Sequence, residues 1–465
     1  MILPLPLWEG VGGRGRPVIG TEPEAFRAGP PPPNPLPQGE GERFRPAAAR
    51  WLHRDRIIAW SGVLLTVQAL LLGFLVLWQH GVFIPIEPPA STDFISFYAA
   101  GKLALAGTPA LAYDQAAHAA AEAAAAEPGI RYRFFFYPPV YLLWCAPLAL
   151  LPYLAGFLAF QAATLSAWLL VMRRILRLAD AAWWIPVLAY PAVFWTIGLG
   201  QNAFLTAALL GGATLLLDER PAVAGVLLGL LCYKPHLALL VPVALAAGGH
   251  WRAFGAAAVT VAVVVGLSVA LFGVEPWRAY LAELGGAAAV YETGRIDLAG
   301  FVTPYGAARL LGAGTGAARA LQAGVSILVA LAVGWIWRRD PGPAVRSAAL
   351  AAGILLSVPV ALVYDLLLLS VAIGWLVRAG RGSGFLAGEP LLLAGCFLVP
   401  LLSFQLGHAA HIPLGPLAPA AVLALCGVRT VRVVPREAGV GSREGERPRM
   451  DLPTQASARK AARTV

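Results

Sequence analysis

The chain has 465 residues, of which 58% are hydrophobic and only 13% are charged. A soluble domain carries about 25% charged residues, so this composition excludes an ordinary soluble protein and indicates one solvated mainly by lipid. The formal net charge of +10 does not indicate nucleic-acid binding, because the arginines cluster in short segments between apolar runs, a pattern that orients membrane helices.

Polar stretches flank the apolar part of the chain. Residues 1–49, with the run Pro30–Pro33 and a glycine-rich stretch at 10–15, cannot form a packed core. They also lack the basic and then apolar order of a signal peptide. We interpret them as a disordered cytoplasmic extension or the product of an over-long gene prediction. Residues 431–465 are expected to be a disordered cytoplasmic tail, which leaves 50–430 as the membrane domain.

The first predicted span runs from Ile57 to Gln79 and follows several arginines, which places the N-terminus in the cytoplasm. Residues 80–136 are then an extracytoplasmic loop that contains an alanine-rich helix at Ala116–Ala126, which we expect at the membrane interface. The chain re-enters at the aromatic run Phe134–Tyr137. Prolines at 147 and 152 predict a short, half-inserted entry helix before the next long span.

Apolar stretches of roughly 20 residues recur as far as Val428, each long enough to span a bilayer. The predicted fold is an all-α polytopic membrane bundle of about eleven to thirteen transmembrane helices. The basic clusters mark its cytoplasmic face, so several polar stretches fall on the opposite face, together with Asp93. These stretches are Gly200-Gln201-Asn202, Lys234-Pro235-His236, residues 273–304, Tyr364-Asp365 and His408 to His411.

Four sequence elements follow one another between residues 90 and 250. They are Asp93-Phe94 with Phe97-Tyr98 and Ala100-Gly101; Tyr137-Pro138-Pro139 with Ala146 to Pro152; Gly200-Gln201-Asn202; and Ala224-Gly225 through Gly229 to Lys234-Pro235. In this order and on one face they resemble the polyprenol-phosphate-dependent mannosyltransferases of glycosyltransferase family 87, within the C-type (GT-C) superfamily. Tyr364-Asp365-Leu366 extends the likeness weakly.

The resemblance implies a GT-C-like enzyme of the bacterial inner membrane whose active site faces the exterior and includes the first external loop. Such enzymes transfer a sugar, here expected to be mannose, from a polyprenyl-phosphate donor to an acceptor hydroxyl. The short external loops indicate a lipid-linked acceptor, so the expected partners are the donor, a glycolipid or glycan acceptor and membrane lipids. No nucleotide-binding motif occurs in the sequence. We predict no metal site and leave dependence on a divalent cation open.

The reaction needs a base for the acceptor hydroxyl and cationic donors for the departing lipid phosphate. The resemblance assigns the first role to Asp93. The competing interpretation is that Asp93 caps the helix that begins at Phe94, a position that aspartate favours.

Two of the lysines are candidates for binding the departing lipid phosphate. The chain has three lysines, of which Lys102 and Lys234 lie in the family-like elements and Lys460 in the tail. Lys234 interrupts an apolar run, where an ionisable residue is a functional candidate and an ammonium suits a phosphate oxygen. The alternative for Lys102 and Lys234 is a lysine that snorkels to the interface.

The remaining candidates are polar residues on the same predicted face. Gln201 and Asn202 could bind sugar hydroxyls or only stabilise a tight turn. Asp365, beside Tyr364, needs a partner inside the membrane, for which Lys234 and Arg309 are candidates. His236 could ligate a metal, contact phosphate or be an ordinary core histidine. Arg295 could pair with phosphate from a loop that covers the acceptor.

Two other functions compete with transfer. A transporter or flippase of lipid-linked sugars would call for internal repeats and broken helices at the bilayer midplane. The polar residues of this chain are instead predicted near one face, which favours chemistry at the membrane surface. The second rival is a catalytically inactive scaffold with the family fold.

Overall fold

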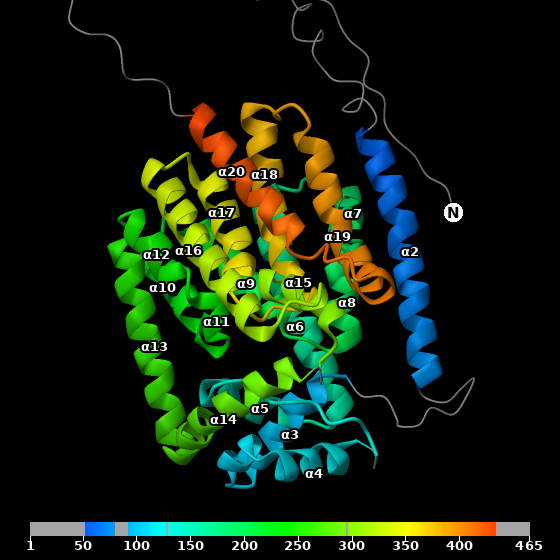
Figure 1. The fold of residues 1–465 in the computed structure, drawn as a ribbon, viewed down its shortest axis with the longest axis vertical. Helices are drawn as coiled ribbons and strands as arrows, with labels where there is room; N and C mark the ends of the chain where they lie inside the picture. Colours follow the sequence, from blue (N-terminus) through cyan, green and yellow to red (C-terminus); the bar gives the residue numbers. More distant parts are fainter. Residues whose placement is uncertain (1–51, 80–91, 127–128, 294–295, 434–465) are drawn as a thin grey trace, which may run out of the picture. The chain divides into compact units, whose positions relative to one another are not determined.

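The computed structural model describes residues 52–79, 92–126, 129–293 and 296–433. The extension expected at 1–49, the tail beyond Val433 and the candidate Arg295 lie outside this part of the chain. Within it the protein is all-α: the only β-type pairing there is an isolated bridge between Phe301 and Leu362. The predicted fold class, an all-α polytopic membrane protein, is confirmed (Figure 1).

Nineteen α-helices are described. Their bounds are α2 Arg54–Gln79, α3 Phe94–Leu105, α4 Gln115–Ala125, α5 Leu142–Ala149, α6 Tyr153–Leu176, α7 Trp184–Leu188, α8 Pro191–Leu199, α9 Ala203–Leu216, α10 Pro221–Leu230, α11 Pro235–Ala238, α12 Val241–Ala247, α13 Trp251–Phe272, α14 Glu275–Glu292, α15 Pro304–Leu310, α16 Thr315–Arg339, α17 Pro343–Ser357, α18 Leu367–Ser383, α19 Glu389–Ala410 and α20 Leu417–Val433. Short 3₁₀ turns join some of them: η1 Pro109–Tyr113, η2 Pro139–Tyr141, η3 Ala181–Trp183, η4 Leu231–Tyr233, η5 Leu298–Gly300 and η6 Val363–Leu366.

Six helices in the described ranges are long and apolar enough to cross a membrane, and a bent pair at 181–199 makes up to seven. Six further apolar helices have only 10–17 residues, so the predicted segments divide into long spans and short or broken ones. Proline and glycine cause the breaks. Pro191 begins α8 after a 63° bend, and Gly200 ends it with φ +68°. As predicted, a short helix, α5, precedes the long α6.

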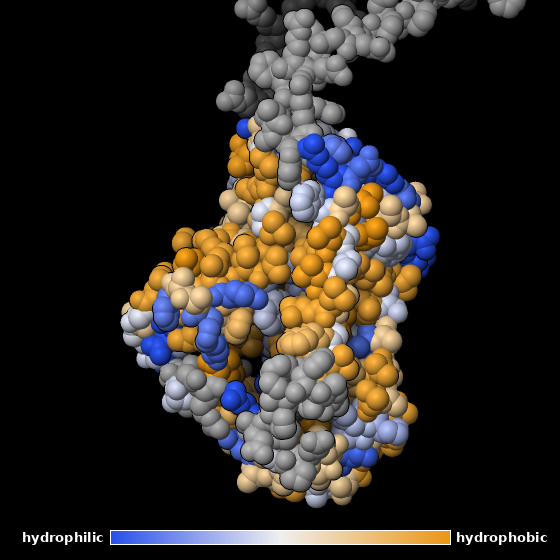
Figure 2. All heavy atoms as spheres, turned by 90° about the vertical axis from the view of Figure 1, so that its right-hand side faces the viewer, coloured by the Kyte–Doolittle hydropathy of each residue, from blue (hydrophilic) through white to orange (hydrophobic). Residues whose placement is uncertain are grey.

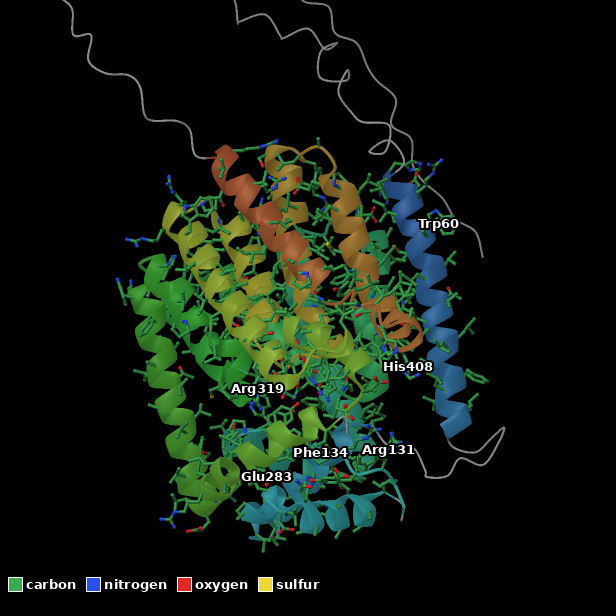
Figure 3. The ribbon with its side chains drawn as sticks, viewed as in Figure 1. Trp60, Arg131, Phe134, Glu283, Arg319 and His408 are labelled. Atoms are coloured by element: carbon green, nitrogen blue, oxygen red, sulfur yellow. The ribbon has the colours of Figure 1, made fainter. Side chains whose placement is uncertain are left out.

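The centre of the bundle consists of α9, α17 and α18, which contact one another. The most hydrophobic window of the span 363–383 is 78% buried, whereas the corresponding windows of α2 and α13 are 11% buried. Leucine, valine and tryptophan side chains of α2 and α13 therefore face outward, as Trp60 does (62% exposed; Figure 3). On the side of the bundle where α2 lies, Figure 2 shows an extensive apolar surface, which suits contact with lipid tails.

Helices α3, α4, α5 and α14 form a layer across one end of the bundle, at the lower end in Figure 1. Helix α3 packs against both α4 and α5, and α14 packs on η1. The contact of α3 with α5 requires glycine at position 101, because a Cβ there would lie 2.3 Å from the Cys145 carbonyl oxygen. We call this layer the outer layer. The predicted alanine-rich helix is α4, and most of the polar stretch 273–304 forms the helix α14.

Arginines gather at the opposite end of the bundle. Arg346 pairs with Asp218 and Asp340, Arg54 pairs with Asp180, and buried Arg429 donates from Nε to Glu389 at 2.8 Å. These pairs join loops that the sequence predicted to share the cytoplasmic face. The two ends of the bundle thus differ in charge, as an oriented membrane protein requires.

Helices α10 and α13 cross at two glycines. A Cβ at Gly225 would lie 2.3 Å from the carbonyl oxygen of Ala253, and one at Gly229 would lie 2.7 Å from that of Ala257. Spacing of small residues by four lets two membrane helices approach closely. The crossing also fixes the direction in which α10 continues toward Lys234.

Gly225→Ala should destabilise the protein, because the added methyl group must push α10 away from α13, at a cost of about 1–3 kcal/mol. The measurement is the midpoint of thermal unfolding in detergent. Gly255→Ala on α13 is the matched control, since no atom lies within 4 Å of the added carbon there and alanine favours a helix. Equal midpoints for the two variants would show that the crossing is not under steric constraint.

Candidate active site

Asp93 stands at the N-terminus of α3, but its side chain does not cap the helix. Its Oδ2 accepts a 2.7 Å hydrogen bond from Gln201 Nε2, and its Oδ1 lies 3.3 Å from Arg133 Nη1. The carboxylate is 21% exposed and the Arg133 side chain 32%. The predicted capping role is therefore wrong for the side chain, whose oxygens point to groups that come from elsewhere in the chain.

The turn between α8 and α9 holds Asp93 in place. Because Gly200 adopts φ +68° and ends α8, the chain reverses and presents the Gln201 amide toward α3. The Asp93 N–H donates to Leu199 O at 2.8 Å, and Gln161 Nε2 of α6 donates to Gln201 O at 3.2 Å. Backbone and side-chain bonds thus fix both partners of the Gln201–Asp93 contact.

The surroundings of Asp93 affect its pKa in opposite directions. Loss of hydration raises the pKa of this carboxyl above its ordinary value, and this is the largest effect. The Arg133 guanidinium, the Gln201 hydrogen bond and the more distant Lys234 ammonium each lower the pKa. The net result is a raised pKa, which makes the carboxylate a stronger base than an exposed aspartate.

Three tyrosine rings form a stack behind the Gln201–Asn202 turn. Tyr141 stacks on Tyr137, with ring centroids 4.5 Å apart, and on Tyr233 at 5.1 Å. Buried Asn202 donates from Nδ2 to the Tyr141 hydroxyl at 3.1 Å. The stack therefore connects the turn after α8 with η4, the turn that precedes Lys234.

Lys234 and Asp365 form a buried ion pair. Lys234 Nζ lies 2.9 Å from Asp365 Oδ1, and their side chains are 4% and 5% exposed. The ammonium also lies 5.2 Å from the ring centroid of Tyr364 and 6.0 Å from that of Tyr137. Of the two predicted partners, Lys234 rather than Arg309 pairs with Asp365. Arg309 Nη1 donates to Ala313 O.

The structure therefore brings together Asp93, Gln201 and Asn202, and places Lys234, Tyr364 and Asp365 beside them through the tyrosine stack. His236 is half-buried on α11, two residues beyond Lys234. Lys102 lies apart from this group. It is exposed near the C-terminus of α3, with its ammonium 5.3 Å from the Tyr98 ring centroid.

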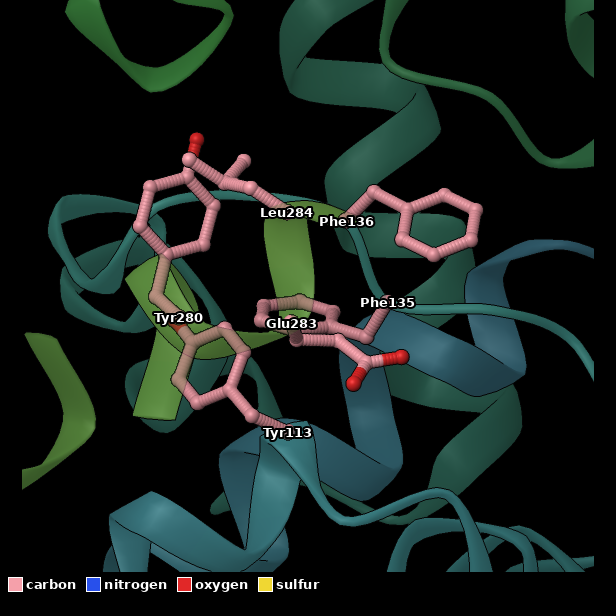
Figure 4. A pocket seen from close by; sticks show the side chains of 6 residues that line it. All are labelled: Tyr113, Phe135, Phe136, Tyr280, Glu283 and Leu284. Atoms are coloured by element: carbon pink, nitrogen blue, oxygen red, sulfur yellow. The ribbon is translucent and has the colours of Figure 1, made fainter. Parts of the chain in front are cut away.

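A small cavity of about 10 Å³ lies in the outer layer (Figure 4). It is lined by Tyr113, Phe135, Phe136, Tyr280, Glu283 and Leu284. Glu283 Oε1 accepts a 2.8 Å hydrogen bond from Gln115 Nε2, which ties α14 to α4. A volume of this size holds about one water molecule, so the cavity is not a sugar site as it stands.

Sequence reasoning missed Arg133. Arg133 directly precedes the aromatic run Phe134–Tyr137, which we interpreted as the point where the chain re-enters the membrane. Figure 3 shows Arg131 and Phe134 near the outer layer. Arg131 and Arg133 lie on the face predicted to carry few arginines, and this exception to the charge pattern was the available signal. Asp93 and Arg133 are also 40 residues apart, so spacing alone does not predict their pairing.

The comparisons with known proteins identify a family. The model of glycosyltransferase family 87 matches residues 135–363, a range that includes Gln201, Lys234 and the start of η6. No curated protein and no solved structure matches the chain. The long apolar helices and the family match together identify a membrane glycosyltransferase. The chain belongs to glycosyltransferase family 87.

Proposed function

We propose that the protein transfers a sugar, mannose in the first instance, from a polyprenyl-phosphate donor to the hydroxyl of a lipid-linked acceptor. The reaction takes place at the extracytoplasmic face of the bacterial inner membrane, in a GT-C-type arrangement. One observation carries the proposal: the carboxylate of Asp93 is held between an amide and a guanidinium and is still partly exposed. A carboxylate in that position can take a proton from a substrate hydroxyl.

Asp93 acts as the general base in this mechanism. The acceptor hydroxyl hydrogen-bonds to the carboxylate, gives up its proton to it and attacks the anomeric carbon of the donor. The bond between that carbon and the phosphate oxygen breaks, and the lipid phosphate leaves with the electron pair. The Gln201 hydrogen bond fixes which lone pairs of Asp93 face the acceptor.

Arg133 and Lys234 supply positive charge for the leaving phosphate. Arg133 is the more accessible of the two (32% against 4% exposed), and its planar guanidinium suits a phosphate. When Arg133 turns to the phosphate, Asp93 loses a neighbouring positive charge that lowers its pKa. Donor binding would thereby strengthen the base at the step that needs it.

The structure does not favour the alternative function, a transporter or flippase of lipid-linked sugars. A broken helix pair does precede Gln201, as it would in many transporters. However, the polar group formed around Asp93 adjoins the outer layer at one end of the bundle. Asp93 directly precedes α3 of that layer, and Arg133, which pairs with Asp93, is bonded through its backbone N–H to Glu122 of α4. The family match also favours a glycosyltransferase.

Asp93→Asn should lower the rate of sugar transfer by about 10²–10⁴-fold, since it removes the base. Transfer is measured in membranes that contain the protein, with labelled polyprenyl-phosphate mannose and endogenous acceptors. Asp114→Asn is the control, because Asp114 caps α4 from the same outer layer and asparagine caps equally well. Full activity of Asp93→Asn would remove Asp93 from the mechanism.

Gln201→Leu should move the acid limb of the pH profile of kcat/KM to higher pH. The Gln201 hydrogen bond favours the ionised form of Asp93, so its loss raises the pKa, and the base becomes active only at higher pH. Gln115→Leu removes a similar amide–carboxylate bond elsewhere in the outer layer and should leave the acid limb in place. An unshifted limb in Gln201→Leu would mean that another group controls it.

The pair Lys234–Asp365 can be tested for function apart from stability. Lys234→Met alone leaves a buried carboxylate without its partner, which costs about 3–5 kcal/mol. The double change Lys234→Met with Asp365→Leu should restore the unfolding midpoint but leave transfer reduced by about 10²-fold or more, because the phosphate loses a cationic donor. Recovery of both stability and transfer in the double variant would show that the pair is only structural.

A further inference from the structure

A second buried pair of ionisable groups lies next to the proposed base. His118 and Glu122 are one helical turn apart on α4, and both are 0% exposed. His118 Nε2 lies 3.1 Å from Ser96 O of α3, three residues beyond Asp93. Glu122 Oε2 accepts a 3.0 Å hydrogen bond from the backbone N–H of Arg133. The pair therefore bonds to both chain segments that meet at the Arg133–Asp93 contact.

A further hydrogen bond joins α3 directly to the segment that contains Arg133. Ser96 Oγ donates to Phe134 O at 3.2 Å, so α3 holds the residue after Arg133 directly. Helix α4 thus holds this segment in place by its Glu122 bond while it holds α3 by its His118 bond. A shift of α4 would displace the Arg133 guanidinium relative to Asp93.

The protonation of the pair follows from the atoms that face each other. His118 Nε2 must carry a hydrogen, because its neighbour is a carbonyl oxygen, so Nδ1 of a neutral ring has a lone pair. Nδ1 lies 3.6 Å from Glu122 Oε1, and neither atom has a hydrogen-bond partner among the described residues. A proton on Glu122 Oε1, directed at Nδ1, satisfies both atoms after a small shift.

We propose that His118 and a protonated Glu122 form a neutral pair that positions Arg133 against Asp93, and that loss of the Glu122 proton impairs transfer. This inference rests on the proposed function. Neither residue touches a substrate in it, so both are positioning residues. The chemical role of the pair is to keep a second negative charge away from the base while it holds the Arg133 segment.

The pKa directions support the neutral pair. Burial raises the pKa of Glu122 to about 8 and lowers that of His118 to about 4. Other groups that face Glu122 are Arg133, whose backbone bond and charge lower its pKa, and Asp93, whose charge raises it. Tyr153 also interacts with Glu122 electrostatically, and the Tyr132 ring contacts His118.

The sign of the pH dependence follows from these shifts. Because the pKa of Glu122 is raised in the folded protein, the stability that it contributes is lost as the pH rises through about 8. The pKa of His118 is lowered, so its contribution is lost as the pH falls through about 4. The neutral pair therefore persists between these two values.

The test compares the neutral isostere of Glu122 with its truncation. Glu122→Gln can still accept from Arg133 N–H and donate to His118 Nδ1, so it should keep wild-type transfer at pH 7 and lose the decline above about pH 8. Glu122→Ala should reduce transfer about tenfold or more at every pH, since small misplacements near the reacting atoms are costly. Exposed Glu219→Gln, at the other end of the bundle, should behave as the wild type.

Two results would overturn the proposal: an alkaline decline that persists in Glu122→Gln, or a loss in Glu122→Gln as large as in Glu122→Ala. Infrared spectra of the purified protein in lipid nanodiscs give a readout that needs no substrate. The carbonyl band of a protonated carboxylic acid should be present at pH 7 in the wild type and in Asp93→Asn, titrate near pH 8 and be absent from Glu122→Gln. Absence of that band from the wild type rejects the neutral pair, whereas a band without sugar transfer rejects only the proposed function.

Discussion

The hydrogen bond from Gln201 to Asp93 joins the membrane bundle to its outer layer, and the rest of the site depends on it. It spans 108 residues of sequence, and the neighbouring bond from Asp93 N–H to Leu199 O supports it. Since Gln201 belongs to a turn fixed by Gly200, the position of the carboxylate is set by backbone geometry in the bundle. The Arg133 segment and α4 then pack against a carboxylate that is already oriented.

Local sequence patterns predicted individual helices of this arrangement. The first span, the alanine-rich helix and the short helix before α6 follow from hydropathy, helix propensity and proline. The Lys234–Asp365 partnership was one of two alternatives, because an intramembrane charge requires an opposite charge but the sequence does not say which one. Asp93 was identified by resemblance, and only the structure shows that its side chain bonds to Gln201 instead of capping α3.

The contacts that sequence could not predict are those between distant, individually unremarkable residues. Arg133 precedes an aromatic run that indicates only a membrane boundary, and His118 and Glu122 lie in an alanine-rich helix that was predicted only to lie at the membrane interface. Tertiary packing buries His118 and Glu122 completely. Burial of this kind depends on which helix faces which, and the 3.6-residue period does not contain that information.

The Lys234–Asp365 pair has a consequence for the synthesis of the protein. The two residues are 131 positions apart, and a ribosome adds about 5–20 residues per second. For roughly ten seconds, the nascent chain therefore contains the lysine before its aspartate exists. During that interval the ammonium has to stay in the insertion machinery or in water at the lipid surface. The helices that adjoin Lys234 therefore reach their final packing only after the segment with Asp365 has been synthesised. The part of the bundle around this ion pair consequently assembles late.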